Sequence, residues 1–187
     1  MESFDDEKSE TLFLLRDNDV FANLSLMPRT EWQDRITAKA VVFNERNEIA
    51  LIGNAVHDLL LLPGGGIDAE ESVINGLRRE CLEEIGYHVS IDQFLGKTED
   101  FRSRDGRHTI SYGYVARTES QAQSDLTDNE KSVGTYVAWV SFSEALKRLK
   151  LQQDKIKQES NPKFYNSCFN AIRDYFFLQR TDALLGK

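Results

Sequence analysis

A glycine-rich turn followed by an acidic amphipathic helix is the feature that most constrains how this chain can fold. Pro63 and the three glycines after it stop a short apolar run. From Glu70 to Ile85, apolar residues recur at helical spacing and form one stripe: Val73, Ile74, Leu77, Cys81 and Ile85. Gly86 stands where a helix C-terminal glycine belongs. These residues predict a loop that leads into a helix with one face on a core.

The same predicted helix carries three glutamates close together. With about 100° per residue, Glu80 and Glu84 lie within roughly 40° of each other, and Glu83 lies beside Glu80. Like charges at this spacing destabilise a helix. A hard cation resolves the conflict, because Mg²⁺ takes oxygen ligands and is usually held by a few carboxylates plus substrate phosphates. A solvated acidic helix face is the alternative for such a motif taken alone.

The residues around the glutamates favour the metal site over the solvated face. The glycines 64–66 supply a flexible backbone that can approach a ligand and turn a carbonyl onto a metal. Gly76 lies inside the helix, where glycine costs about 1 kcal/mol relative to alanine. A clear face for metal and phosphate explains that cost, and close helix packing explains it equally well.

The segment from Gly65 to Tyr87 resembles the Nudix box. The match reads Gly65-x5-Glu71-x7-Arg79-Glu80-Cys81-x-Glu83-Glu84-x-Gly86-Tyr87, and it contains every fixed Gly, Glu and Arg of that pattern. Cys81 and Tyr87 depart from it at two bulky aliphatic positions, but both are apolar. The resemblance extends more loosely from Ile36 to Lys150. It implies the Nudix fold, an α/β/α sandwich with a mixed β-sheet.

Around the box, the sequence predicts strands interleaved with helices, an order typical of α/β layered domains. The expected strands are 36–43, 49–53, 59–62, 89–95, 109–116 and 135–140. Ser141 is expected to open a short helix that ends at Lys150, and Asn161-Pro162 a longer one. Thr11–Arg16 and residues 20–27 are expected to form a hairpin around 17–19. We divide the chain into an N-terminal extension (1–35), the Nudix domain (36–150) and a C-terminal helix (151–187) that packs on the domain or forms a dimer contact.

The resemblance also implies roles for the box residues. Glu80, Glu83 and Glu84 are expected to be Mg²⁺ ligands, with Glu80 and Glu84 the most direct, and the Gly65 carbonyl joins them; Mn²⁺ is a possible substitute. Glu71 and Arg79 are expected to pair and to brace the loop against the helix. Losing that pair would disturb the site indirectly.

The implied reaction is attack by water on a phosphorus of the diphosphate bridge. Metal ions neutralise the phosphate oxygens and lower the pKa of the water, and a carboxylate takes its proton. In the family this base is either a box glutamate, here Glu83 or Glu84, or an acid in a later loop. The loop candidates are Asp125, Asp128 and Glu130, and the alternative is that these acids only solvate the loop. We choose Glu130, because similar sequences often place a glutamate about nine residues before the tryptophan that is Trp139 here.

The substrate is constrained less by the sequence. Subfamilies that cut ADP-ribose or dinucleoside polyphosphates often carry a proline or tyrosine in the window that is 102–105 here, and neither is present. Arg102 and Arg104 belong to a basic cluster with Arg107 and His108, which holds phosphates or is a solvated turn. Tyr112, like Phe101 and Tyr114, stacks on a base or belongs to the core.

Composition excludes several classes of protein. The 31 acidic and 23 basic residues give a net charge of −8, which disfavours a nucleic-acid polymer as partner. No apolar run approaches the roughly 18 residues of a membrane span, and the acidic start is unlike a signal peptide. The two cysteines, Cys81 and Cys168, are expected to be buried thiols. A cytoplasmic location follows.

The resulting hypothesis is a Mg²⁺-dependent hydrolase of the pyrophosphate bond in a nucleoside triphosphate or a nucleoside-diphosphate-linked metabolite. One alternative is a Nudix domain that senses a nucleotide metabolite without turnover, although such domains usually lose box glutamates. A second is an isomerase of isopentenyl diphosphate on the same fold, which needs a nucleophilic cysteine and extra metal-binding histidines. A homodimer is also expected, since many relatives dimerise.

Overall fold

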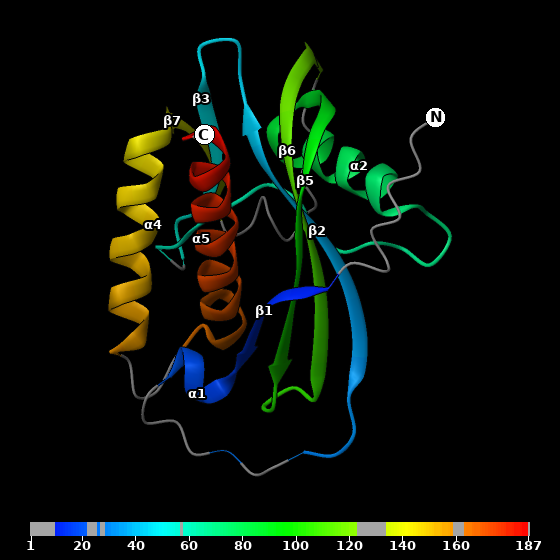
Figure 1. The fold of residues 1–187 in the computed structure, drawn as a ribbon, viewed down its shortest axis with the longest axis vertical. Coiled ribbons are helices and arrows are strands. Elements are labelled where there is room, and N and C mark those ends of the chain that lie inside the picture. Colours follow the sequence, from blue (N-terminus) through cyan, green and yellow to red (C-terminus); the bar gives the residue numbers. More distant parts are fainter. Residues whose placement is uncertain are drawn as a thin grey trace.

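A seven-stranded mixed sheet lies between helices in the computed structural model, which describes residues 10–21, 26, 29–56, 58–122, 134–158 and 163–186 (Figure 1). The strands are β1 (Thr11–Arg16), β2 (Gln33–Phe43), β3 (Glu48–Asn54), β4 (Leu60–Leu61), β5 (Tyr87–Arg102), β6 (Arg107–Gln121) and β7 (Thr135–Ser141). The helices are α1 (Asp17–Val20), α2 (Val73–Ile85), α4 (Phe142–Lys157) and α5 (Tyr165–Leu185). The strand order is β1-β5-β6-β2-β3-β4, with β7 on β3. The β1–β5 and β2–β6 pairs are parallel.

Helices cover both faces of the sheet (Figure 1). Ala38 and Ala40 of β2 pack in the same core cluster as Leu77 of α2. The alternating residues Val41 and Phe43 pack with α4 and α5 on the other face. Successive strand residues point to opposite faces, and both faces are covered by helices. Residues 40–43 at the end of β2 are therefore all apolar and all buried. The expected α/β sandwich with a mixed sheet is confirmed.

The helix boundaries follow the caps in the sequence. The Ser72 hydroxyl accepts the Asn75 N–H, so α2 begins at Val73, and Gly86 ends it at φ 72°. The Ser141 hydroxyl accepts the Glu144 N–H at 3.2 Å and opens α4, as the sequence predicts. The α4 helix continues to Lys157, beyond the expected end at Lys150, because Leu149 and Ile156 are both buried.

At residues 17–19 the structure has a short helix in place of the expected hairpin turn. Asp17–Val20 forms α1, and β1 pairs in parallel with β5, a partner distant in sequence. The polar residues that suggested a turn make other bonds: Asp17 accepts a hydrogen bond from the Tyr165 hydroxyl, and Asp19 accepts one from the Arg16 N–H at 2.7 Å. Most of 20–27 lies outside the described residues.

The C-terminal helix α5 is part of the same body. Its residues Phe169, Ile172, Phe177 and Leu178 are buried, and a charged pair, Arg173 and Asp174, is buried among them. The helix packs on the sheet face opposite α2 (Figure 1). Within the described ranges, no helix combines the length and apolarity that a membrane crossing requires.

Candidate active site

Two glutamates of α2 converge on the glycine loop. The Glu84 carboxylate accepts the Gly64 N–H at 2.7 Å. Glu80 lies so close to Gly65 that a Cβ on this glycine would come within 2.4 Å of a Glu80 carboxylate oxygen. Since the two glutamates are one helical turn apart, both carboxylates face the same stretch of loop backbone.

The loop is held in place by strand β2. The Ala38 N–H donates to the Gly65 carbonyl and the Ala40 N–H to the Pro63 carbonyl, each at 3.0 Å. The buried Lys39 ammonium donates to the carbonyls of Leu62 and Gly64. The Gly65 carbonyl thus uses one lone pair on the sheet and keeps the second for another donor or a cation.

Arg79 joins the loop to the helix through several bonds. Its guanidinium pairs with Glu71 at 2.7 Å, as the box predicts, and donates to the Gly66 carbonyl at 3.0 Å. It also contacts Glu80 at 3.1 Å and Glu83 at 3.3 Å. The hydrogen bond from Arg79 lowers the pKa of Glu71, and its counterpart raises the pKa of Arg79. The pair therefore braces the loop, and it also turns Glu83 toward Arg79.

Gly76 is explained by packing. A Cβ at this position would lie 2.5 Å from Ile67 Cδ1 and 2.8 Å from a Glu71 carboxylate oxygen. Gly76 therefore lets the loop press against α2. Of the two explanations left open by the sequence, the structure supports close packing.

The donor set fits a divalent cation with two carboxylates. No group of three acidic, histidine or cysteine side chains in the described part of the chain is arranged as a metal cluster, and Glu83 is engaged with Arg79. Mg²⁺, however, is commonly held by one or two carboxylates together with waters and substrate phosphates. Glu80, Glu84 and the Gly65 carbonyl offer the hard oxygen atoms that this cation prefers. Burial raises the pKa of Glu80, against the opposing hydrogen bond from Arg79.

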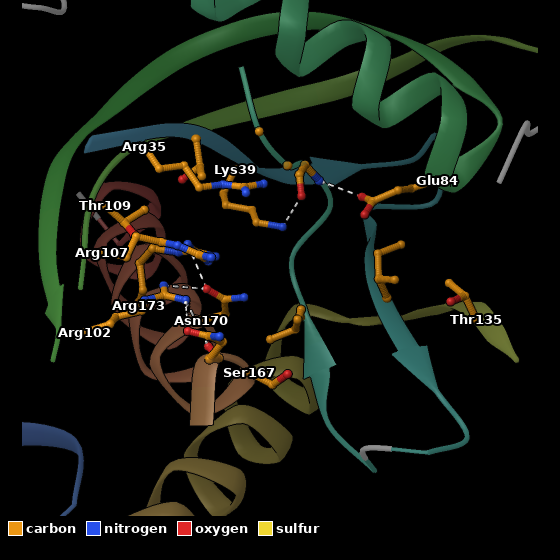
Figure 2. A pocket seen from close by; sticks show the side chains of 17 residues that line it. Arg35, Lys39, Glu84, Arg102, Arg107, Thr109, Thr135, Ser167, Asn170 and Arg173 are labelled. Atoms are coloured by element: carbon orange, nitrogen blue, oxygen red, sulfur yellow. Dashed lines mark hydrogen bonds between the residues drawn. The ribbon is translucent and has the colours of Figure 1, made fainter. Parts of the chain in front are cut away.

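A cavity of about 570 Å³ opens beside this loop. Figure 2 shows Glu84 at one side and a group of cationic side chains at the other. The cations come from three strands and α5: Arg35, Lys39, Arg102, Arg107 and Arg173. Polar residues of α5 complete that wall: Asn166, Ser167 and Asn170. Anionic groups are the ligands that such a lining favours.

The residues chosen from sequence for substrate binding separate in the structure. Arg102 lines the cavity, where Asp100 holds it at 2.6 Å. Arg104 instead lies over the Tyr165 ring at 4.6 Å, beside a second, smaller cavity. Tyr112 is buried in the core against Phe94 and does not line the larger cavity.

Sequence reasoning missed several other residues that line the cavity, although the pattern of β2 could have indicated some of them. Arg35, Thr37 and Lys39 alternate with apolar residues along β2, and all three line the cavity. Arg173 gave no comparable signal, because its place depends on how α5 packs. The proposed loop base Glu130 lies outside the described residues, as do Asp125 and Asp128.

Comparison with known proteins gives a consistent result. A family model described as the NUDIX domain matches residues 33–160. A Bacillus subtilis (strain 168) protein named "Putative 8-oxo-dGTP diphosphatase" is 33% identical over 91 residues, 49% of this chain and 59% of that protein. "Diphosphoinositol polyphosphate phosphohydrolase 2" of Rattus norvegicus is 25% identical over 138 residues, 70% of this chain and 74% of that protein. The crystal structure of a MutT protein from Methanosarcina mazei Go1 shares the fold, with a TM-score of 0.55 at 20% identity over 85% of this chain and 100% of that one.

Proposed function

The chain belongs to the Nudix family, and from this premise we propose that it is a Mg²⁺-dependent hydrolase of pyrophosphate bonds. The proposed substrate is a nucleoside triphosphate or a nucleoside-diphosphate-linked metabolite, and the reaction is attack of water on phosphorus. The observation that carries the proposal is the convergence of Glu80 and Glu84 on the glycine loop beside a cation-lined cavity. The carboxylates that would bind a metal ion and the cationic side chains that would bind phosphate groups lie on two sides of the same cavity.

We assign the cation to Glu80, Glu84 and the Gly65 carbonyl, with Glu83 as a further ligand. When bound, Mg²⁺ or Mn²⁺ supplies charge for the phosphate oxygens and a lowered pKa for the attacking water. Glu83, Glu84 or Glu130 takes the proton from that water. Glu71 and Arg79 act indirectly, because they hold the loop that presents Gly65.

The names of the relatives support the reaction class. One relative is named as a diphosphatase and the other as a phosphohydrolase of a diphosphorylated compound. Both names describe cleavage at a phosphorus atom, although the two names give different substrates. We also propose a cytoplasmic location, supported by two buried cysteines, Cys81 and Cys168, that form no disulfide. A homodimer stays a prediction, which size-exclusion chromatography with light scattering tests.

The test is hydrolysis by the purified chain with and without Mg²⁺. The panel holds nucleoside triphosphates, ADP-ribose, nucleotide sugars, dinucleoside polyphosphates and a diphosphoinositol polyphosphate, and released phosphate is read with and without added phosphatase. We expect metal-dependent release that falls at least about 100-fold in Glu84→Gln. Glu119→Gln, at an exposed position of β6, is the matched control.

Metal-independent release, or full activity in Glu84→Gln, would contradict the proposed site. Silence across the whole panel, with binding of one member retained, would favour the sensor alternative.

A further inference from the structure

The cations of the cavity are not equally neutralised. Arg102 is paired with Asp100, and Arg173 is paired with Asp174 at 2.8 Å. Among the described residues, no carboxylate lies within ion-pairing distance of Arg35 or Arg107, which line the same cavity. In a chain of net charge −8, two unpaired guanidinium groups facing one space form an unusual concentration of positive charge.

These groups repel one another in the absence of an anion. Burial, followed by the charges of Arg107 and Arg102, lowers the pKa of Arg35. The Arg35 guanidinium also lies against the glycine loop, since a Cβ on Gly66 would come within 2.9 Å of its Nη2. Arg35 therefore lies close to the glycine loop and feels the charges of the neighbouring arginines, whose repulsion a bound anion would offset.

Two buried polar atoms in the lining lack a hydrogen-bond partner. They are Thr109 Oγ1 and Arg173 Nη2, on side chains that are each about 1% exposed. Nη2 lies 2.8 Å from Asp174, but the angle does not make a hydrogen bond. Buried polar atoms are nearly always paired. Both residues line the cavity in Figure 2, so a ligand with oxygen atoms there is the natural partner.

Helix α5 makes this wall rigid. Arg102 donates to Asn170 Oδ1 at 2.8 Å and to Asn166 Oδ1 at 3.2 Å, and Arg173 donates to Ser111 at 3.3 Å. The wall is therefore ordered by side-chain bonds before a ligand arrives. The family model ends at residue 160, so α5 adds to the site from beyond the matched segment.

The described lining contains no aromatic side chain. A nucleobase is usually held by stacking on an aromatic ring, whereas phosphate groups are held by arginine forks and hydroxyl or amide donors. The lining offers the second kind of contact from β2, β6 and α5.

We propose that this cavity binds a cluster of phosphate groups that the substrate carries in addition to the bridge being cut. Arg35 and Arg107 make the direct charged contacts, and α5 closes the site with Asn170 and Arg173. This inference rests on the proposed hydrolase and narrows its substrate class to small molecules with several phosphate groups. The phosphate groups belong either to a phosphorylated ring or to a linear phosphate chain. The cavity recognises this part of the substrate without stacking a nucleobase.

Binding without turnover tests this inference separately from hydrolysis. Inositol hexakisphosphate, tripolyphosphate and adenosine are titrated calorimetrically into the full chain in EDTA, so that no metal-dependent step contributes. We expect at least one phosphorylated probe to bind, adenosine not to bind, and affinity to fall about tenfold or more in Arg35→Gln and in Arg107→Gln. Glu84→Gln should not weaken the binding, because it removes a negative charge from the cavity lining. This makes a failure of the hydrolase distinguishable from a failure of this site.

Arg180→Gln is the matched control, because Arg180 is exposed on the same helix α5 and does not line the cavity. Tighter binding of inositol hexakisphosphate supports a ring-borne cluster, and tighter binding of tripolyphosphate supports a linear chain. The proposal is overturned if neither probe binds, if Arg180→Gln weakens binding as much as Arg107→Gln, or if adenosine binds as well as the phosphorylated probes. Unchanged melting temperatures of the variants confirm that the fold is intact.

Discussion

The Asp174 carboxylate on α5 accepts the Leu62 N–H at 2.9 Å, which fixes the C-terminal helix to the segment just before the glycine loop. The same carboxylate pairs with Arg173, and both side chains are buried. One residue thus connects α5, the cavity wall and the entry to the box.

Asp174→Asn should therefore destabilise the whole protein. The variant leaves the Arg173 guanidinium buried without a counter-charge, and we expect the free energy of unfolding to fall by about 3 kcal/mol. Urea denaturation followed by circular dichroism measures the change. Asp182→Asn, at an exposed position of the same helix, should change stability little. Equal stabilities of the two variants would show that the buried pair contributes nothing.

Gly64→Ala should destabilise the loop through its backbone. Gly64 has φ 119°, and a Cβ there would lie 2.2 Å from the Ala38 carbonyl oxygen. Backbone cannot move aside as a side-chain end can, so we expect a loss of roughly 2 kcal/mol in the free energy of unfolding. Thermal and urea denaturation check this. Gly186→Ala, whose nearest contact is 3.4 Å, is the tolerated control.

Gly65→Ala should act on the chemistry and leave the fold intact. The three heavy atoms nearest to its Cβ would all belong to the Glu80 carboxylate, which can move away from the loop. Because a small misplacement of a reacting group costs much rate, we expect hydrolysis to fall at least about tenfold and to need more Mg²⁺. Steady-state rates across a Mg²⁺ titration measure this, beside melting temperatures. A variant with unchanged rates would remove Glu80 and Gly65 from the proposed metal site.

Much of the fold could be predicted because its signals are local. The box helix, its glycine cap and the Ser141 cap depend on residues within one or two turns of each other. The family match over residues 33–160 confirms the Nudix membership expected from the box. The N-terminal region was less predictable, since its strand β1 pairs with a distant partner: Leu14 lies opposite Glu99 of β5. The residues of a local turn cannot predict a pairing between strands so far apart in the sequence.

The candidate site was predictable only on its acidic side. The resemblance to the Nudix box predicted that Glu71 and Arg79 pair, and the structure forms this pair at 2.7 Å. The cationic side joins β2, the start of β6 and α5, which are far apart in sequence. Arg173 in particular is a buried charge on a helix that otherwise reads as amphipathic, and only its packing places it in the cavity.

The stability of the protein should depend on pH through Glu99. A hydrogen bond from Thr11, and further contacts with His108, lower the pKa of Glu99 below its ordinary value of 4.5. A carboxyl with a lowered pKa stabilises the fold above its unfolded pKa, and that stabilisation is lost as pH falls through the folded pKa. We expect Glu99→Gln to cost about 1 kcal/mol at pH 7.

The difference between wild type and Glu99→Gln should shrink below pH 4.5, the ordinary value for this group. Urea denaturation at pH 7 and at several acidic pH values measures it. Glu119→Gln, on the exposed end of β6, is the control for the loss of one negative charge. A difference that stays constant through the acidic range would show that Glu99 has the same pKa in the folded and the unfolded state.

Cys81 should be chemically silent in the folded protein. Its side chain lies on the buried face of α2, in the core, and burial raises the pKa of the thiol far above neutral. A thiolate is the reactive form, so Ellman's reagent at pH 8 should modify neither Cys81 nor the buried Cys168 until the chain is denatured, when both react. Rapid modification of Cys81 in the native state, with loss of activity, would instead restore the isomerase alternative, which requires a nucleophilic cysteine.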